Sequence, residues 1–306
     1  EDSRRDRRSS ADTMKMSYMA RVQANLTRRE VIKTDYKSGN VLEGTYESLF
    51  KGKSMEFDEL REYVMGDEVN DIDWKASSRS RRLLVRQYIA EKKHNVLFVL
   101  DTNRRMLAAS SALEEKKDVA LMCAGTMAYF VNHNNDYIGA LYSGGGSVSY
   151  MPLKTGMANV ERILEGYDHA VKEDNRSSMN DTIDYMVRNL KKRMIVVIIT
   201  DLEGAYEISE QNLKRLKAAC DVMFITVSDV SLEGDKLYDM LQDSYMDDFF
   251  LKDKKLNKLL KEKRAELEAV NGRKLNRLGI TNTIVHSVSG LGATVGELLE
   301  RHRLGG

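Results

Sequence analysis

Two fully apolar runs, each followed by an aspartate, constrain the fold of this chain more than any other feature. Residues 96–100 read Val-Leu-Phe-Val-Leu and precede Asp101, and residues 194–200 read Met-Ile-Val-Val-Ile-Ile-Thr and precede Asp201. Neither run alternates with polar residues, which indicates strands covered on both faces. Such strands belong to the interior of a parallel sheet with helices on both sides.

The remaining pattern after residue 94 agrees with this fold class. Residues 137–142 and 148–153 flank a Ser/Gly run and predict a hairpin, and further strands are predicted at 222–227 and 283–288. Amphipathic periodicity predicts helices at residues 111–132, 158–167, 181–190, 209–219, 254–275 and 295–301. Strands separated by helices favour an α/β fold with a mostly parallel sheet and helices on both faces.

Composition narrows the classes of partner. The 306 residues allow one or two domains, and 48 Lys+Arg against 47 Asp+Glu leave a formal charge of +1. Such a balance gives no general attraction to nucleic acid or anionic lipid, so we expect no specific nucleic-acid partner. A nucleic-acid binder that uses local basic stretches stays open as an alternative.

Cysteine content and hydropathy indicate the compartment. Two cysteines, Cys123 and Cys220, do not form a disulfide framework in a chain of this length, which favours a reducing compartment. The longest apolar run, residues 194–199, is far shorter than the roughly 20 residues of a membrane helix. Because the chain begins with Glu1, we expect it to be part of a longer protein, whose anchoring segment would lie outside this sequence.

The chain divides into three predicted parts. Residues 1–40 form a polar, basic N-terminal segment, residues 41–93 a small β-rich signature module, and residues 94–306 the α/β domain. In the module an acidic stretch, 56–73, precedes a basic one, 75–93, and we expect the two to neutralise each other. Asp67, Asp71 and Asp73 are therefore predicted to form salt bridges, and Trp74 to anchor the module on the α/β domain.

Asp101 and Asp201 are the first candidate functional residues. In open α/β sheets, ligands bind outside the carboxyl ends of the strands, so both acids are expected at one crevice. Two carboxylates there could hold a hard divalent cation. They could equally cap helices or pair with a nearby basic side chain, and the pattern leaves both interpretations open.

Several motifs in the module resemble those of a known family. They are Lys51 to Tyr63 (Lys-Gly-Lys-Ser-Met-Glu-Phe-Asp-Glu-Leu-Arg-Glu-Tyr), Gly66-Asp67, Ile72-Asp-Trp-Lys-Ala76, Arg79, Leu84-Val-Arg86 and Glu91. Their order closely resembles the signature of the bacterial family called domain of unknown function 58. In that family the signature precedes a von Willebrand factor A-like domain, and residues 198–202, Ile-Ile-Thr-Asp-Leu, resemble the strand that carries its second acid. The resemblance implies a Rossmann-type, von Willebrand A-like fold from residue 94.

The resemblance also implies a function. Members act by binding partners, often beside an AAA+ ATPase of the MoxR type, so a non-enzymatic interaction or assembly role is expected. Many relatives carry hydrophobic spans ahead of the signature. We therefore expect a cytoplasmic location, with the full-length protein tethered to the inner face of the cell membrane through residues absent from this chain.

The metal-binding motif of von Willebrand A domains is only partly present. The resemblance implies Asp-x-Ser-x-Ser at residues 101–105, where this chain reads Asp101-Thr-Asn103-Arg-Arg105. A guanidinium near Asp101 and Asp201 would neutralise both carboxylates, so we expect a degenerate site with weak or no metal affinity. If Arg105 points to solvent, Asp101, Asn103 and Asp201 remain usable ligands for Mg²⁺. The candidates for the distant hydroxyl ligand are Ser177, Ser178 and Thr182.

The predicted site is thus a surface for a protein partner, formed by Asp101, Asn103, Arg105 and Asp201. No catalytic residue or other cofactor is predicted, because the chain lacks a Walker A motif, a Gly-x-Ser-x-Gly elbow and a zinc pattern. The alternative from the enzyme class is a metal-dependent hydrolase or phosphotransfer protein that uses the same residues.

Overall fold

The computed structural model describes most of the chain after residue 93 and parts of the chain before it. Its described residues are 17–27, 59–67, 69, 72–87, 93–110, 112, 114–144, 147–229, 238–239, 244–245 and 254–305. Part of the signature, residues 51–58 together with Asp71 and Glu91, lies outside them.

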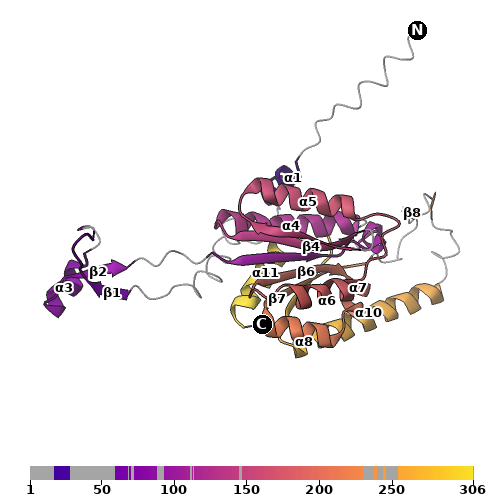
Figure 1. Ribbon diagram of the computed structural model, residues 1–306. Coiled ribbons are helices and arrows are strands. Elements are labelled where there is room, and N and C mark those ends of the chain that lie inside the picture. Colours follow the sequence, from indigo (N-terminus) through magenta and orange to yellow (C-terminus); the bar gives the residue numbers. More distant parts are fainter. Residues whose placement is uncertain are drawn as a thin grey trace, which may run out of the picture.

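A six-stranded sheet forms the centre of the α/β domain (Figure 1). Its strands are β3 (Asn95–Leu100), β4 (Tyr137–Gly144), β5 (Ser147–Lys154), β6 (Ile195–Asp201), β7 (Asp221–Val227) and β10 (Thr281–Val285). They lie in the order β10-β7-β6-β3-β4-β5, and every neighbouring pair is parallel except the β4–β5 hairpin. The predicted mostly parallel sheet and hairpin are confirmed.

Helices cover both faces of the sheet, as predicted. One layer contains α1 (Tyr18–Thr27), α4 (Lys116–His133), α5 (Met157–Ala170) and α11 (Leu291–Arg303), and the other contains α6 (Met179–Asn189), α7 (Leu202–Glu207), α8 (Glu210–Ala219) and α10 (Lys254–Arg277). Strand β3 shows why its run is continuously apolar. Val96 and Phe98 pack in the first layer while Leu97 and Val99 pack in the second, so no position on this strand faces water.

Helix α1 belongs to the packed domain although it lies within the predicted N-terminal segment, 1–40. Met19 and Val22 are buried against α4 and α5, and Val22 lies so close to Gly125 that a Cβ there would come within 2.5 Å of its Cγ2. Glu161 accepts hydrogen bonds from the backbone N–H groups of Tyr18 and Met19, at 2.7 and 2.9 Å. The helix therefore joins the domain by both apolar packing and polar contacts.

The described part of the signature module contains the antiparallel strands β1 (Glu59–Glu62) and β2 (Leu84–Gln87), with α3 (Trp74–Ser80) between them. Two pairs of charges neutralise each other, Arg61 with Asp67 and Arg82 with Glu62. Asp73 accepts from the N–H groups of Lys75 and Ala76 as the N-cap of α3.

The prediction for Trp74 is wrong. Trp74 is the first residue of α3 and is 63% exposed. Ile72 and Val85 are instead the buried hydrophobic residues in the described part of the module. Trp74 therefore does not anchor the module on the α/β domain in this structure.

The described residues of the domain also form three short elements, the 3-10 helix η3 (Arg104–Leu107) after β3 and the antiparallel strands β8 (Tyr238–Asp239) and β9 (Ser244–Tyr245). None of the helices among the described residues combines the length and apolar character that a membrane crossing requires.

Candidate functional site at the carboxyl end of the sheet

The topology brings Asp101 and Asp201 together. The chain proceeds from β3 to β4 on one side, whereas β6 lies on the other side of β3, so the strand order reverses between β3 and β6. Leu100 is in register with Ile199, and the Asp101 N–H donates to the Ile199 carbonyl at 3.0 Å. Ligands of doubly wound folds bind at such a switch point. We call this end of the sheet the rim.

Asp101 is 1% exposed, and both of its carboxylate oxygens are occupied by neighbours. Oδ2 accepts from the Thr200 hydroxyl at 2.6 Å and Oδ1 from the Asn103 N–H at 2.9 Å. Burial, and next the negative charge of Asp201, raise the pKa of Asp101 to about 6. The carboxyl group of Asp101 is therefore protonated in a fraction of the molecules near neutral pH.

Asp201 is fully buried and titrates in the opposite direction. Oδ1 accepts from the Gly204 N–H at 2.8 Å, which makes Asp201 the N-cap of α7. Oδ2 accepts from the Lys116 ammonium at 2.8 Å. Burial alone would raise the pKa of Asp201, but Lys116 and Arg105 outweigh it and hold the pKa below its ordinary value. Asp201 is thus the permanently charged member of the pair.

Arg105 lies between the two acids. Its guanidinium is 3.6 Å from Asp101 Oδ2 and 3.5 Å from Asp201 Oδ1, and 3.7 and 3.6 Å from carboxylate oxygens of Glu203 and Glu207. Nε and Nη2 are buried and make no hydrogen bond within the part of the chain that the structure describes. The side chain is 26% exposed, so Arg105 connects the buried acids with the surface.

Lys116 and Asp229 complete the site, and the sequence reasoning missed both. Lys116, the first residue of α4, is 2% exposed, and its Nζ lies 2.5 Å from Asp229 Oδ1 in addition to its contact with Asp201. Asp229 lies two residues after the end of β7, and Asp101 lies directly after the end of β3. A search for acidic residues at the ends of the predicted strands could therefore have found Asp229. Lys116 had no such signal, because its contacts lie 85 and 113 residues away in the sequence.

These five side chains alternate in charge. In spatial order they are Asp229, Lys116, Asp201, Arg105 and Asp101, and we call them the rim cluster. Within the cluster each cation contacts two carboxylates, which offsets the cost of burying the charges. Burial alone would lower the pKa of Lys116, but Asp201 and Asp229 hold it above its ordinary value.

Asn103 holds the loop after β3 in place. Its Oδ1 accepts from the Arg105 N–H at 3.0 Å, and its Nδ2 donates to the Ser177 carbonyl at 2.8 Å. Of the three hydroxyl candidates, Ser177 is beside this loop, with its Oγ 3.2 Å from the Thr102 hydroxyl. Ser178 instead caps α6, and the Thr182 hydroxyl bonds with that of Ser143 at 2.7 Å.

Gly204 allows α7 to approach the cluster. A Cβ at this position would lie 2.1 Å from Thr200 Oγ1 and 2.6 Å from Asp101 Oδ2. Any larger residue would displace the carboxylate or the helix. No sequence pattern indicated that glycine is required here.

The residues at the rim do not fit an octahedral Mg²⁺ site as they lie. Mg²⁺ needs oxygen ligands at about 2.1 Å, yet the oxygens of Asp201 accept from Lys116 and Gly204. The Asn103 oxygen is occupied, and a guanidinium replaces the second serine of the motif. No group of three or more His, Cys, Asp or Glu side chains is placed to hold a metal within the described ranges.

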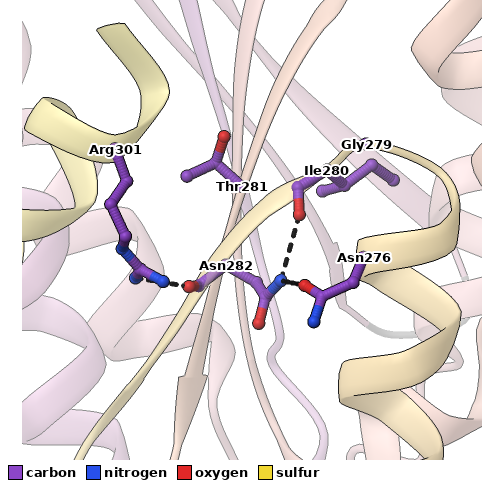
Figure 2. A pocket seen from close by; sticks show the side chains of 6 residues that line it. All are labelled: Asn276, Gly279, Ile280, Thr281, Asn282 and Arg301. Atoms are coloured by element: carbon purple, nitrogen blue, oxygen red, sulfur yellow. Dashed lines mark hydrogen bonds between the residues drawn. The ribbon is translucent and has the colours of Figure 1, made fainter. Parts of the chain in front are cut away.

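A small pocket lies at the other end of the sheet (Figure 2). It encloses about 160 Å³ and is lined by Asn276, Gly279, Ile280, Thr281, Asn282 and Arg301. Its polar groups bond one another, because Asn282 Nδ2 donates to Asn276 Oδ1 and to the Ile280 carbonyl, while Arg301 donates to the Asn282 carbonyl. The pocket therefore offers a ligand few free polar groups.

The strand order, the antiparallel edge strand and the acids at the switch point define a von Willebrand A-like domain. The chain belongs to the family described as Protein of unknown function DUF58, which matches residues 59–234 and thus more than half of the sequence. The predicted family and fold are confirmed.

Named relatives are uncharacterized proteins of mycobacteria. Mb1516 of Mycobacterium bovis and Rv1480 of Mycobacterium tuberculosis are each 28% identical to this chain over 195 residues, which cover 63% of this chain and 61% of theirs. The match thus spans less than two thirds of their length.

Similar solved structures include BatB from Bacteroides thetaiotaomicron, 16% identical, with a TM-score of 0.42 over 68% of this chain and 98% of BatB. A von Willebrand factor type A protein from Catenulispora acidiphila is 10% identical, with a TM-score of 0.39 over 70% of this chain and 44% of its own.

Proposed function

We propose that this chain is a non-enzymatic interaction or assembly factor that binds a protein partner at the rim. In line with the family resemblance, the proposed partner is an AAA+ ATPase of the MoxR type, met in the cytoplasm at the inner face of the cell membrane. The observation that carries the proposal is the state of Arg105.

The Arg105 guanidinium is surrounded by carboxylates at ion-pair distance. Four carboxylates surround it at 3.5–3.7 Å, and its buried Nε and Nη2 have no hydrogen-bond acceptor among the described residues. Guanidinium groups bind carboxylates best through short, paired hydrogen bonds. An acidic partner side chain that replaces Glu203 or Glu207 at Arg105 would gain such bonds without exposing the buried acids.

The predicted partner-binding residues differ in how they could contribute. Asp101, Asn103 and Asp201 are buried and hold Arg105 and its loop in position. Residues that a docked partner would touch are the exposed neighbours Arg104, Arg176, Glu203, Tyr206 and Glu207. Tyr206 is 56% exposed, and aromatic side chains of this kind often anchor interfaces.

One observation favours an enzyme instead. A raised pKa such as that of Asp101 is common among catalytic carboxyls. Asp101, however, is buried, and its oxygens accept hydrogen bonds from Thr200 and Asn103. Burial beside Asp201 accounts for the raised pKa of Asp101 without a catalytic role. We therefore rank a metal-dependent hydrolase or phosphotransfer protein second.

A pull-down tests the proposal. The chain is immobilised with Tyr206→Ala and Glu203→Ala as parallel baits, and MoxR-type ATPases retained from the native host are quantified by mass spectrometry. We expect at least a fivefold loss of the ATPase with Tyr206→Ala and higher retention with Glu203→Ala, because removal of this competing carboxylate frees Arg105 for the acidic side chain of the partner. Tyr137→Ala is the matched control, because Tyr137 is a 38% exposed tyrosine at the amino end of β4. Retention that is unchanged in all three variants, or no ATPase with the unmodified chain, would contradict the proposal.

A further inference from the structure

We infer that Lys116 is a built-in cation, which occupies the position where a divalent ion would otherwise bind and makes the rim independent of metal. The statement about partner binding rests on the proposed function, whereas the exchange between lysine and metal stands by itself. Nothing in the sequence pattern pointed to Lys116.

The Lys116 ammonium lies where two carboxylates meet. The Lys116 Nζ lies 2.8 Å from Asp201 Oδ2 and 2.5 Å from Asp229 Oδ1, so two carboxylate oxygens from different strands converge on one point. Divalent ions bind carboxylate oxygens at about 2.0–2.6 Å, and Mg²⁺ is often held by one or two carboxylates and several waters. The ammonium therefore occupies a point that already has two suitable ligands.

The positive charge of Lys116 balances the buried carboxylates of the rim. Lys116 is 2% exposed and reaches the rim from the first residue of α4. Without its charge, Asp229 would lose the ammonium beside it, and Asp101 and Asp201 would keep only the guanidinium of Arg105 among the described residues. Buried carboxylates with too few counter-charges attract a divalent ion strongly. The lysine thus satisfies the same charge requirement without leaving a ligand site open.

The side chain of methionine offers a sharp test. Lys116→Met retains an unbranched apolar stem that ends near the lysine Cε, so it removes the ammonium and frees the Nζ position. Lys117→Met is the matched control, because the neighbouring Lys117 pairs with Asp168 and Glu115, which lie outside the rim cluster. Thermal unfolding of the full chain is recorded in chelator, Mg²⁺ and Mn²⁺.

We expect the melting temperature of the unmodified chain and of Lys117→Met to change by less than about 1 °C between chelator and metal. That of Lys116→Met should fall in chelator and rise by about 5 °C or more in saturating Mn²⁺. Addition of Asp229→Asn should abolish this rise. If Lys116→Met does not fold in chelator, the variant is refolded with Mn²⁺, and recovery of the folded protein would show that the metal replaces the ammonium.

Two results would overturn the inference. One is micromolar binding of Mg²⁺ or Mn²⁺ to the unmodified chain by calorimetry that disappears in Asp101→Ala. The other is a Lys116→Met protein that gains no stability from either metal. Pull-downs in chelator and in Mg²⁺ should retain equal amounts of ATPase. If the ATPase is not retained but Lys116→Met still gains stability from the metal, only the proposed function would be contradicted.

Discussion

The rim cluster and the signature module carry the same kinds of charged side chains under opposite conditions. In the module, Arg61 and Asp67 are six residues apart, and the Arg82 and Glu62 side chains are 71% and 59% exposed. In the rim cluster, Lys116 and Asp201 lie 85 residues apart and are almost completely buried. Water screens the first set and hardly reaches the second, so similar ion pairs have different energetic consequences.

Lys116→Ala should give the largest effect. Removing one partner of a buried ion pair leaves Asp201 and Asp229 without their ammonium, which costs about 3–5 kcal/mol. Urea unfolding measures the loss. Lys117→Ala, which removes a lysine whose partners are more exposed, should cost about 1 kcal/mol or less. Equal losses would show that burial at the rim does not set the difference.

Gly204→Ala should come next. Its new methyl group would meet Thr200 and Asp101 at distances that demand movement, and we expect a loss of about 2–3 kcal/mol in the same assay. Gly272→Ala provides the control, because a Cβ there meets nothing within 4 Å inside α10. That variant should gain about 0.5–1 kcal/mol. If Gly204→Ala leaves the free energy of unfolding unchanged, α7 can move away from Thr200 and Asp101 without cost.

Asp101→Asn should change how stability depends on pH. Because the pKa of Asp101 is raised to about 6 from 3.8, the folded chain binds a proton between these values that the unfolded chain has released. This carboxyl therefore lowers stability as the pH rises through that window. Asp101→Asn, uncharged throughout, should match the unmodified chain near pH 4 and exceed it by about 2 kcal/mol at pH 7.5.

Urea unfolding at both pH values checks this prediction. The lowered pKa of Asp201 acts in the opposite direction, but Asp201 is present in both proteins and largely cancels in the difference. An asparagine variant that is less stable at pH 7.5 than the unmodified chain would contradict the expected sign.

Asp73→Ala should give the smallest effect. The loss of the N-cap costs about 1 kcal/mol, and we expect it to stay within the module. Amide hydrogen exchange should accelerate about fivefold in α3 and remain unchanged in β6. Acceleration in both elements would show that the module and the rim are coupled.

The sequence predicted the sheet well because its strongest signals are local. The continuous apolar runs before Asp101 and Asp201 can only be covered on both faces, and this requirement selects buried parallel strands. The hairpin at 137–153 and the helix that became α10 were visible for the same reason. Trp74 was misjudged because a single aromatic residue does not reveal which surface will cover it.

The site was predictable only in part. Asp101 and Asp201 were predicted at the rim because each lies at the carboxyl end of a predicted strand. Asn103 and Arg105 were predicted there because they occupy the serine positions of the metal-binding motif that begins at Asp101. Lys116 was invisible, because no local pattern marks the lysine at the start of α4 as the one that turns inward. Gly204 was missed because its requirement comes from side chains on β3 and β6.

The sequence by itself determined the fold class, the family and the strand ends at which charge gathers, because apolar periodicity and ordered motifs act over a few residues. Only the tertiary structure decided which charges meet. Asp229, Lys116, Asp201, Arg105 and Asp101 become one alternating cluster because parallel strands and α4 deliver them to the same buried end of the sheet. Long-range packing of this kind sets the local dielectric and the counter-charge of each group, and these two quantities determine how the rim can bind.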